Sequence, residues 1–307
     1  MDIFIIGLSI IAVLILLAAY LAFKKTFLFT SGKEQNIYKG LDGELDEIKK
    51  KRRDSIERMA SIPSEDVYIN SRDGLRLRAH YYHIADGAPL AIQFHGYKSR
   101  ALRDCAGGGY ECIRRGYNLL LVDQRAHGES CGKVITFGAK EKHDVISWID
   151  YAIARFGGDV RIMLFGMSMG AGTVLMASEL DLPKNVIGIV ADCPFSSTRG
   201  IIKKVIGDMG LPGGICYPFV KLGALIFGRF NPDGASPVSA VKNTEIPILL
   251  IHGDGDTFVP CSMSEEICKS GKTVTFIKIK DATHGLSYVY DYEGYTHALD
   301  KFIGDIM

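Results

Sequence analysis

The chain has 307 residues, 47% of them hydrophobic, and a formal net charge of +1. That length is enough for one large α/β domain with additional segments. A charge so close to zero gives no electrostatic reason to expect a nucleic acid partner.

The seven cysteines favour a reducing compartment over a disulfide framework. Their number is odd, and no two of them form a Cys-x-x-Cys pair. His80 and His83 stand three residues apart but have no third ligand at a metal-binding spacing. We therefore expect free thiols, no metal and no cofactor.

The N-terminal segment differs in kind from the rest of the chain. Ile3 to Phe23 contains no charged residue and, as a helix, would span about 30 Å, the thickness of a bilayer core. A cleaved signal peptide is the alternative, but it needs a basic region before the apolar run, where only Asp2 is charged. We expect residues 1–24 to be a retained transmembrane anchor.

Basic residues after this span predict its orientation. Lys24, Lys25 and Lys33 follow it, and the run from Lys49 to Arg53 comes further on. The positive-inside rule then places the C-terminal domain in the cytoplasm. Residues 25–65 are expected to be a juxtamembrane linker. The basic 49–53 run in it could be attracted to an anionic membrane surface, and a solvated helix face explains it equally well.

From residue 66 onwards, strand and helix patterns alternate. A Ser71–Gly74 turn between two alternating runs predicts an antiparallel hairpin. Six apolar runs follow as expected strands, at 89–94, 117–123, 161–165, 186–192, 246–252 and 273–279. Helices are expected between them at 105–115, 138–155 and 171–177, and after them at 295–306.

The apolar runs are nearly continuous, which is typical of parallel strands covered by helices on both faces. We therefore predict an α/β fold with an eight-stranded, mostly parallel sheet in residues 66–307. Residues 196–240 interrupt the alternation with short apolar and Pro/Gly-containing pieces. We expect them to form a small helical cap over the carboxyl edge of the sheet.

The most informative motif is Gly166-Met167-Ser168-Met169-Gly170, between an expected strand and an expected helix. Strand, Gly-x-Ser-x-Gly and helix are the context of a nucleophile elbow, which exposes the serine hydroxyl at the end of the strand. The sequence thus predicts Ser168 as a nucleophile.

A serine nucleophile needs a base and an acid that orients the base. His284 follows the last strand and is the expected base, and Asp256 follows the strand before it and is the expected acid. Asp254 and Asp192 are alternative acids. Asp123 is expected to stabilise a loop, as are the histidines that sit in glycine turns at strand ends, namely His95, His127 and His252.

The oxyanion that forms during acyl transfer needs N–H donors aimed at it. In an elbow, one donor is the backbone N–H after the nucleophile, which is that of Met169. The other comes from the loop after the third strand, where His95-Gly96 leads to the N–H of Tyr97.

These motifs together resemble the α/β-hydrolase-fold serine hydrolases over residues 66–307. The matching segments are His95-Gly96, 123–130, 166–170, 192–195, 252–260 and His284-Gly285. With the N-terminal span, the chain resembles membrane-tethered bacterial hydrolases akin to the acyl-hydrolase and dipeptidyl-peptidase-like branches. It departs from many relatives at Ala126 and lacks the His-Gly-Gly-Gly motif of the hormone-sensitive-lipase branch.

The resemblance and the predicted residues imply a cofactor-free serine hydrolase of carboxylic esters. An apolar cap beside a membrane anchor suggests an acyl or lipid-like substrate. A protein or acyl thioesterase, an acyltransferase and a peptidase stay open, because all of them use the same elbow and catalytic residues. A non-catalytic binding protein on this scaffold is the alternative from a different class.

Overall fold

The apolar runs of the sequence form one sheet of eight strands. The computed structural model describes residues 2–30, 38 and 45–307, and Lys33 lies outside the described residues. The strands are β1 (Glu65–Asn70), β2 (Arg76–Tyr82), β3 (Leu90–Phe94), β4 (Asn118–Asp123), β5 (Ile162–Met167), β6 (Val186–Asp192), β7 (Ile248–Gly253) and β8 (Val274–Ile279).

The strand order is β1-β2-β4-β3-β5-β6-β7-β8. β1 pairs antiparallel with β2 and β2 antiparallel with β4, and every later pairing is parallel. The predicted mostly parallel sheet with a hairpin at one edge is therefore confirmed. Because parallel strands end at one edge, the residues that follow β3, β5, β6 and β7 come together there.

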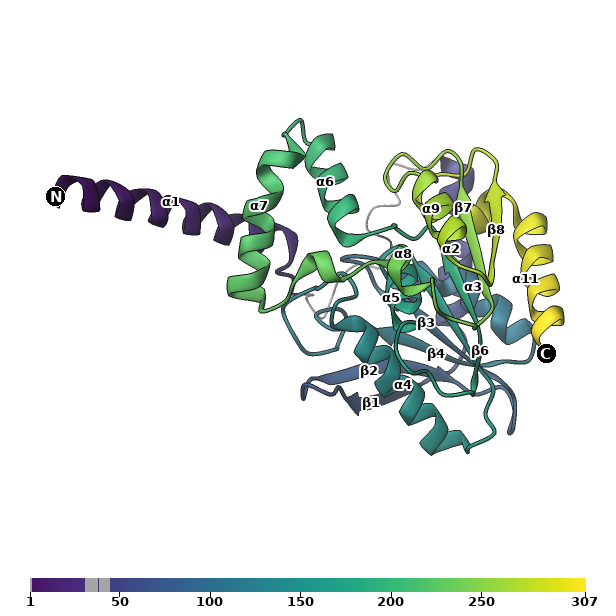
Figure 1. The fold of residues 1–307 in the computed structure, drawn as a ribbon. Helices are drawn as coiled ribbons and strands as arrows, with labels where there is room; N and C mark the ends of the chain where they lie inside the picture. Colours follow the sequence, from purple (N-terminus) through teal and green to yellow (C-terminus); the bar gives the residue numbers. More distant parts are fainter. Residues whose placement is uncertain (1, 31–37, 39–44) are drawn as a thin grey trace.

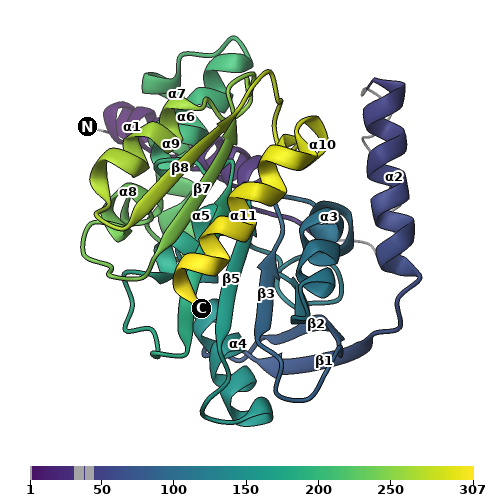
Figure 2. The same ribbon diagram turned by 90° about the vertical axis from the view of Figure 1, so that its right-hand side faces the viewer.

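Helices cover both faces of the sheet (Figures 1 and 2). The side chains of α4 and α5 pack with those of α9 on one face, and α2, α3 and α11 pack on the other. The helices are α1 (Asp2–Thr26), α2 (Asp46–Ala60), α3 (Ala101–Arg114), α4 (Glu141–Phe156), α5 (Met169–Ala177), α6 (Thr198–Asp208), α7 (Gly213–Gly223), η1 (Ala224–Gly228), η2 (Pro232–Gly234), α8 (Pro237–Ala240), α9 (Ser262–Ser270), α10 (Ser287–Tyr290) and α11 (Tyr292–Ile306).

Several helices differ from the sequence-based expectation, and α3 and α11 begin earlier than expected, at Ala101 and Tyr292. The helix expected from Gly138 begins at Glu141, because Phe137 and Gly138 have φ values of +53° and +93° and the Glu141 carboxylate accepts the Gly138 N–H at 2.8 Å. The expected linker contains α2, whose Ile56 and Met59 are buried against the domain. Residues 31–37 and 39–44 of that linker lie outside the described residues.

The N-terminal helix α1 projects away from the sheet and ends beside the cap (Figure 1). Ile3–Thr26 is long and apolar enough to cross a membrane, a property that signal sequences share. Its last turns pack inside the molecule, where Ala19 and Phe23 are buried against the cap, as is Phe27 directly after the helix.

The segment expected as a cap consists mainly of α6, α7 and η1, inserted after β6. In Figure 1, α7 lies across the C-terminal part of α1. The two helices approach closely at Gly223, where a Cβ atom would overlap the carbonyl oxygen of Ala19. A glycine permits this contact because it brings no side chain to the crossing point.

Candidate active site

Ser168 stands in the turn between β5 and α5. Its backbone has φ +54° and ψ −113°, a conformation that non-glycine residues rarely adopt, and its N–H donates to the Asp192 carbonyl at 2.8 Å. A Cβ at Gly166 would overlap the Gly170 carbonyl, and one at Gly170 would overlap that of Phe94. Both glycines thus allow the strand and the helix to approach closely enough for a sharp elbow.

The structure brings Ser168 together with His284 and Asp256. His284 Nε2 lies 2.9 Å from Ser168 Oγ, and His284 Nδ1 lies 2.6 Å from Asp256 Oδ2. Both are hydrogen-bond distances, so the hydroxyl is bonded to the imidazole and the imidazole to the carboxylate. Such a chain allows the imidazole to accept the hydroxyl proton while the carboxylate stabilises the charged ring.

Asp256 is buried and accepts hydrogen bonds at both of its oxygens. Oδ1 receives the N–H groups of Phe258 and Val259, each at 2.9 Å, and Oδ2 lies 3.1 Å from His252 Nε2 as well as beside His284. Burial alone would raise the pKa of this carboxyl. The hydrogen bonds from His252 and His284 outweigh burial and hold the pKa well below its usual range.

His252 is a member of the site to which sequence reasoning gave only a loop role. Its Nδ1 lies 2.7 Å from Ser264 Oγ on α9, so its Nε2 is the nitrogen left to face Asp256 and the Val259 carbonyl at 2.9 Å. The residue thereby holds the Asp256 loop against α9. The sequence signal was its place at the end of β7, four residues before the predicted acid.

The two alternative acids occupy other positions. Asp254 Oδ1 accepts the backbone N–H of Asp281 at 2.6 Å, which ties two loops together. Asp192 accepts the Ser287 hydroxyl at 3.2 Å, and burial raises its pKa to about 6. Neither carboxylate has a hydrogen bond to the imidazole of His284 among the described residues.

The loop after β3, which carries the predicted second oxyanion donor, runs beside Ser168. A Cβ placed on Gly96 would lie 3.5 Å from the Cβ of Ser168. The carboxylate of Asp104 on α3 fixes the loop by accepting the Gly96 N–H at 2.9 Å and the Ser99 hydroxyl at 2.6 Å. The N–H groups of Tyr97 and Met169 have no hydrogen-bond acceptor within the described part of the chain.

Two buried histidines support the turns around this loop. The Gln124 N–H donates to His95 Nε2 at 3.1 Å, and the Lys98 N–H donates to His127 Nε2 at 3.0 Å. Burial lowers the pKa of His127 well below its usual range, so its ring is neutral and can accept that bond. The carboxylate of Asp123 serves the same region by accepting the Glu129 N–H at 3.2 Å.

Ser168 opens into an apolar cavity of about 520 Å³ beneath the cap. Ile201 and Val205 of α6, Phe219 of α7, and Ala18 and Leu21 of α1 are among its lining residues. Lys25 is the only charged residue among the described lining residues. The cavity therefore suits an uncharged hydrocarbon group of a ligand.

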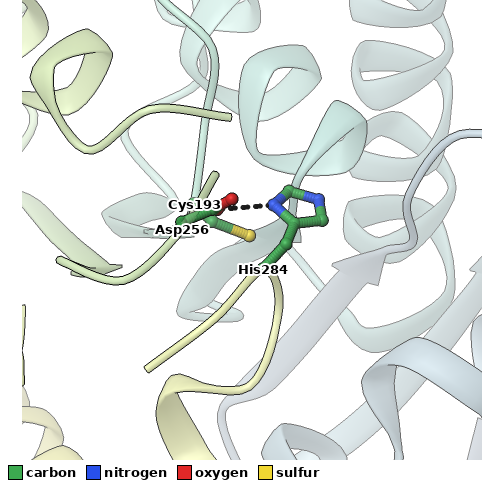
Figure 3. A group of neighbouring side chains, drawn as sticks. All are labelled: Cys193, Asp256 and His284. Carbon is green, nitrogen blue, oxygen red and sulfur yellow. Dashed lines mark hydrogen bonds and ion pairs between the residues drawn. The ribbon is translucent and has the colours of Figure 1, made fainter. Parts of the chain in front are cut away.

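Cys193, Asp256 and His284 form a group with one potential metal ligand each, all within 4.8 Å of one another (Figure 3). Burial, and then the neighbouring carboxylates of Asp192 and Asp256, raise the pKa of Cys193 well above its usual range. A thiol must be deprotonated to bind zinc, and His284 Nδ1 is already engaged by Asp256. Asp256 and His284 are thus bonded to one another and, through His284, to Ser168, which leaves His284 Nδ1 without a free position for an ion.

A family model described as "Serine aminopeptidase, S33" matches residues 90–211 of the chain. The chain is similar to the uncharacterized protein YqkD of Bacillus subtilis, with 26% identity over 194 residues. That alignment covers 62% of this chain and 63% of YqkD, so the chain spans somewhat less than two thirds of this relative.

Solved structures share the fold. An esterase of Pyrococcus furiosus, Pf2001, is similar with a TM-score of 0.67 and 23% identity, over 91% of this chain and 98% of that one. Est1E of Butyrivibrio proteoclasticus, solved with ferulic acid bound, has a TM-score of 0.59 and 22% identity, over 78% of this chain and 98% of that one. These structural similarities, together with the strand order of the sheet, show that the chain has the α/β-hydrolase fold.

Proposed function

We propose that this chain is a serine esterase that cleaves carboxylic esters through an acyl-enzyme intermediate. The observation that carries the proposal is that Asp256 is hydrogen-bonded to His284, and His284 to Ser168. The serine also lines an apolar cavity that could hold the acyl group. The strained backbone of Ser168 supports the same role, because such strain persists where function requires it.

The reaction has two halves with the same proton carrier. His284 Nε2 takes the proton of Ser168 Oγ as that oxygen bonds to the acyl carbon, and the Met169 and Tyr97 N–H groups stabilise the oxyanion. The ester C–O bond then breaks, and His284 returns the proton to the leaving alcohol. Water, deprotonated by His284, attacks the acyl-enzyme, releases the carboxylic acid and restores the Ser168 hydroxyl.

The low pKa of Asp256 supports its role as the orienting acid. A carboxyl that stays ionised throughout the neutral range can stabilise the imidazolium formed in each half-reaction. Asp192, with a pKa raised to about 6 by burial, is only partly suited to that task.

The lining of the cavity favours an acyl chain over a peptide. An aminopeptidase has to bind the positively charged amino terminus of its substrate, and a carboxylate is the natural partner for that charge. Among the described residues that line the cavity there is no Asp or Glu. A thioester has the same acyl group as an oxygen ester, so thioesters belong in the same substrate panel.

We also propose that α1 is a retained membrane anchor with the hydrolase domain on the cytoplasmic side. The Tyr97 hydroxyl donates to the Thr26 carbonyl at 2.6 Å, and Lys98 Nζ donates to the Lys25 carbonyl at 3.1 Å. The end of α1 is thus bonded to the loop that carries an expected oxyanion donor. Earlier in the same helix, Ala19 lies against Gly223 of α7 and the Tyr20 ring packs on Phe227, and cleavage of the helix as a signal sequence would remove both contacts.

The experiment is a chain-length series of 4-nitrophenyl esters and matching thioesters, given to membranes that carry the full chain. We expect hydrolysis to rise from acetyl to octanoyl esters and to disappear in Ser168→Ala. Ser270→Ala, a serine on α9 outside the cavity, is the matched control and keeps parent activity. Equal rates in Ser168→Ala and parent would refute the serine mechanism, and equal rates for all chain lengths would refute the acyl-chain assignment.

A further inference from the structure

The cap presents an exposed apolar surface on α7 and η1. Ile215 is 67% exposed, and Leu225, Ile226 and Phe227 are 39–45% exposed. From Met209 to Val220 the chain contains no charged residue. We call Met209, Leu211, Ile215, Leu225, Ile226 and Phe227 the cap face. Apolar groups gathered in this way mark a surface that binds a partner.

The cap face is continuous with the exposed surface of α1. The rings of Tyr20 and Phe227 pack edge to face at 5.2 Å, and those of Phe23 and Phe227 lie 5.8 Å apart. Gly223 brings α7 against the backbone of α1 at Ala19. Whatever surrounds α1 near Ala19 and Phe23 therefore also contacts the cap face.

The length of α1 indicates how deep in a bilayer this crossing with α7 would lie. A helix rises about 1.5 Å per residue, so the 20 residues from Ile3 to Ala22 are about 30 Å long, the thickness of a bilayer core. The helix α7 crosses α1 at Ala19 and Phe23. If α1 spans the membrane, α7 lies at the boundary between the hydrocarbon and the head groups.

The cavity reaches from this boundary to the nucleophile. Ala18 and Leu21 of α1 line it at the crossing, and Ser168 and Met169 line its inner part. Met209 and Leu211 belong both to the cap face and to the lining of the cavity. The exposed apolar surface and the wall of the cavity thus meet at the tip of the cap.

We infer that the bilayer is the partner of the cap face, and that the substrate is a membrane-resident lipid ester. Its acyl chain passes between α1 and the cap into the cavity without crossing water, and its ester group arrives at Ser168. This inference rests on the proposed esterase function, and it adds the source of the substrate and its route. The hydrocarbon core of the membrane continues into the apolar cavity, so the chain is never exposed to solvent.

Fluorescence quenching tests the position of the cap face directly. The chain has one tryptophan, Trp148, and it is fully buried, so the parent supplies the background signal. The full chain is reconstituted in phosphatidylcholine vesicles with or without brominated acyl chains, as Ile215→Trp and as Ile226→Trp. The matched control is Ile84→Trp, a 37% exposed position in the loop after β2.

We expect brominated lipid to lower the added emission of the Ile215→Trp and Ile226→Trp variants by about twofold or more, since an interfacial helix lies about 5–10 Å deep. The emission of the Ile84→Trp variant should not change. Equal, unquenched emission from all three variants would overturn the inference. So would unquenched but blue-shifted emission from the Ile215→Trp and Ile226→Trp variants, which would mean that a second copy of the chain covers the cap face.

A kinetic test separates the route from the chemistry. The double variant Ile215→Glu/Ile226→Glu places charge on the cap face at residues outside the cavity lining. We expect it to hydrolyse 4-methylumbelliferyl oleate embedded in vesicles about tenfold more slowly, because charge is costly in the apolar layer. Hydrolysis of dissolved 4-nitrophenyl acetate should stay at the parent rate, and Ile84→Glu should leave both rates unchanged.

The outcomes distinguish the two proposals. Loss of oleate hydrolysis alone supports the route from the membrane. Full oleate hydrolysis by the double variant overturns the route and leaves the esterase standing. A parent that cleaves neither substrate overturns the esterase, and the route falls with it.

Discussion

Among single residues, Asp256 gathers an unusual number of hydrogen bonds in the site. Four donors converge on its two oxygens, from His252, His284 and the N–H groups of Phe258 and Val259. This arrangement keeps the carboxylate ionised and holds the imidazole of His284 in one orientation.

Asp256→Asn should lower kcat for an octanoyl ester by a factor on the order of 10⁴, because the amide stabilises the wrong tautomer of His284. Asp254→Asn, two residues earlier in the same loop, is the matched control, and we expect it to change kcat less than about tenfold. Steady-state kinetics on both variants checks this. If Asp254→Asn caused the larger loss, the acid would be assigned incorrectly.

Asp192 makes stability depend on pH. Burial raises its pKa to about 6, whereas an unfolded aspartate has a pKa of about 3.9. The folded state therefore holds a proton between these values that the unfolded chain lacks. The stabilisation is complete below the unfolded pKa and is lost as pH rises through about 6.

Asp192→Asn removes this titration and keeps an oxygen that can accept the Ser287 hydroxyl. The free energy of unfolding of the parent should therefore fall relative to that of the variant by about 3 kcal/mol between about pH 3 and about pH 8, at about 1.4 kcal/mol per pKa unit. Urea unfolding in detergent at several pH values measures the difference. A difference that is constant with pH would contradict the assignment.

At the scale of elements, the elbow depends on one helix and two strands approaching without side chains between them. Gly170 of α5 faces the carbonyl oxygens of Phe94 and His95 at the end of β3. The glycine therefore couples the nucleophile to the loop that carries the expected oxyanion donor.

Gly170→Ala should destabilise the protein by about 3 kcal/mol or more, since its Cβ overlaps backbone atoms that cannot move aside. Gly304→Ala in α11 is the matched control. Its Cβ would meet no atom within 4 Å, and alanine favours helix by up to about 1 kcal/mol. Thermal unfolding of both variants tests the contrast, and similar melting temperatures would refute it.

The elements whose pattern is local could be predicted from the sequence. The continuous apolar runs of β3 to β7 and the Gly-x-Ser-x-Gly turn carry their own signal, and so does the hairpin turn at Ser71–Gly74. For α2 the sequence indicates a solvated helix face at 49–53, but its packing against the domain is not predicted, because only the short stripe of Ile56 and Met59 is buried. The start of α4 was misplaced because the carboxylate of Glu141, rather than a preceding cap residue, closes its first turn.

Contacts between segments that are distant in the chain could not be predicted, because no local sequence pattern indicates them. Gly223 and Ala19 lie far apart in the chain, and nothing near either residue indicates the other. The hydrogen bond from His252 to Asp256 joins neighbours in sequence, yet it depends on Ser264 fixing the ring from α9. The positions of Ser168, Asp256 and His284 could be anticipated because the carboxyl edge of a parallel sheet gathers them.

At the scale of the whole molecule, the N-terminal helix and the residues directly after it pack into the α/β domain. Phe23 and Phe27 are buried with Phe137 and Phe230, and backbone hydrogen bonds join Phe27 to Ile135 and Phe29 to Lys133. Removal of the helix up to Ala22 would also uncover Phe227 and Gly223 of the cap, which Tyr20 and Ala19 contact.

We therefore predict that the protein recovered from membranes keeps its N-terminal helix. Intact-mass analysis after alkaline washing of the membranes should give a mass that includes Ile3–Thr26. If the wash released a protein with the mass of a chain that begins after Ala22, the segment would be a cleaved signal sequence.

The most direct test of the central claim is the reaction of the full chain with a fluorophosphonate, followed by peptide mass mapping. An activated serine attacks the phosphorus, displaces fluoride and keeps the phosphonyl group, so the account predicts one adduct, on Ser168, in the parent. The adduct should be absent from Ser168→Ala and strongly reduced in His284→Ala, because that variant lacks the base. No adduct in the parent, or an adduct on another residue, would contradict the assignment of Ser168 as the nucleophile.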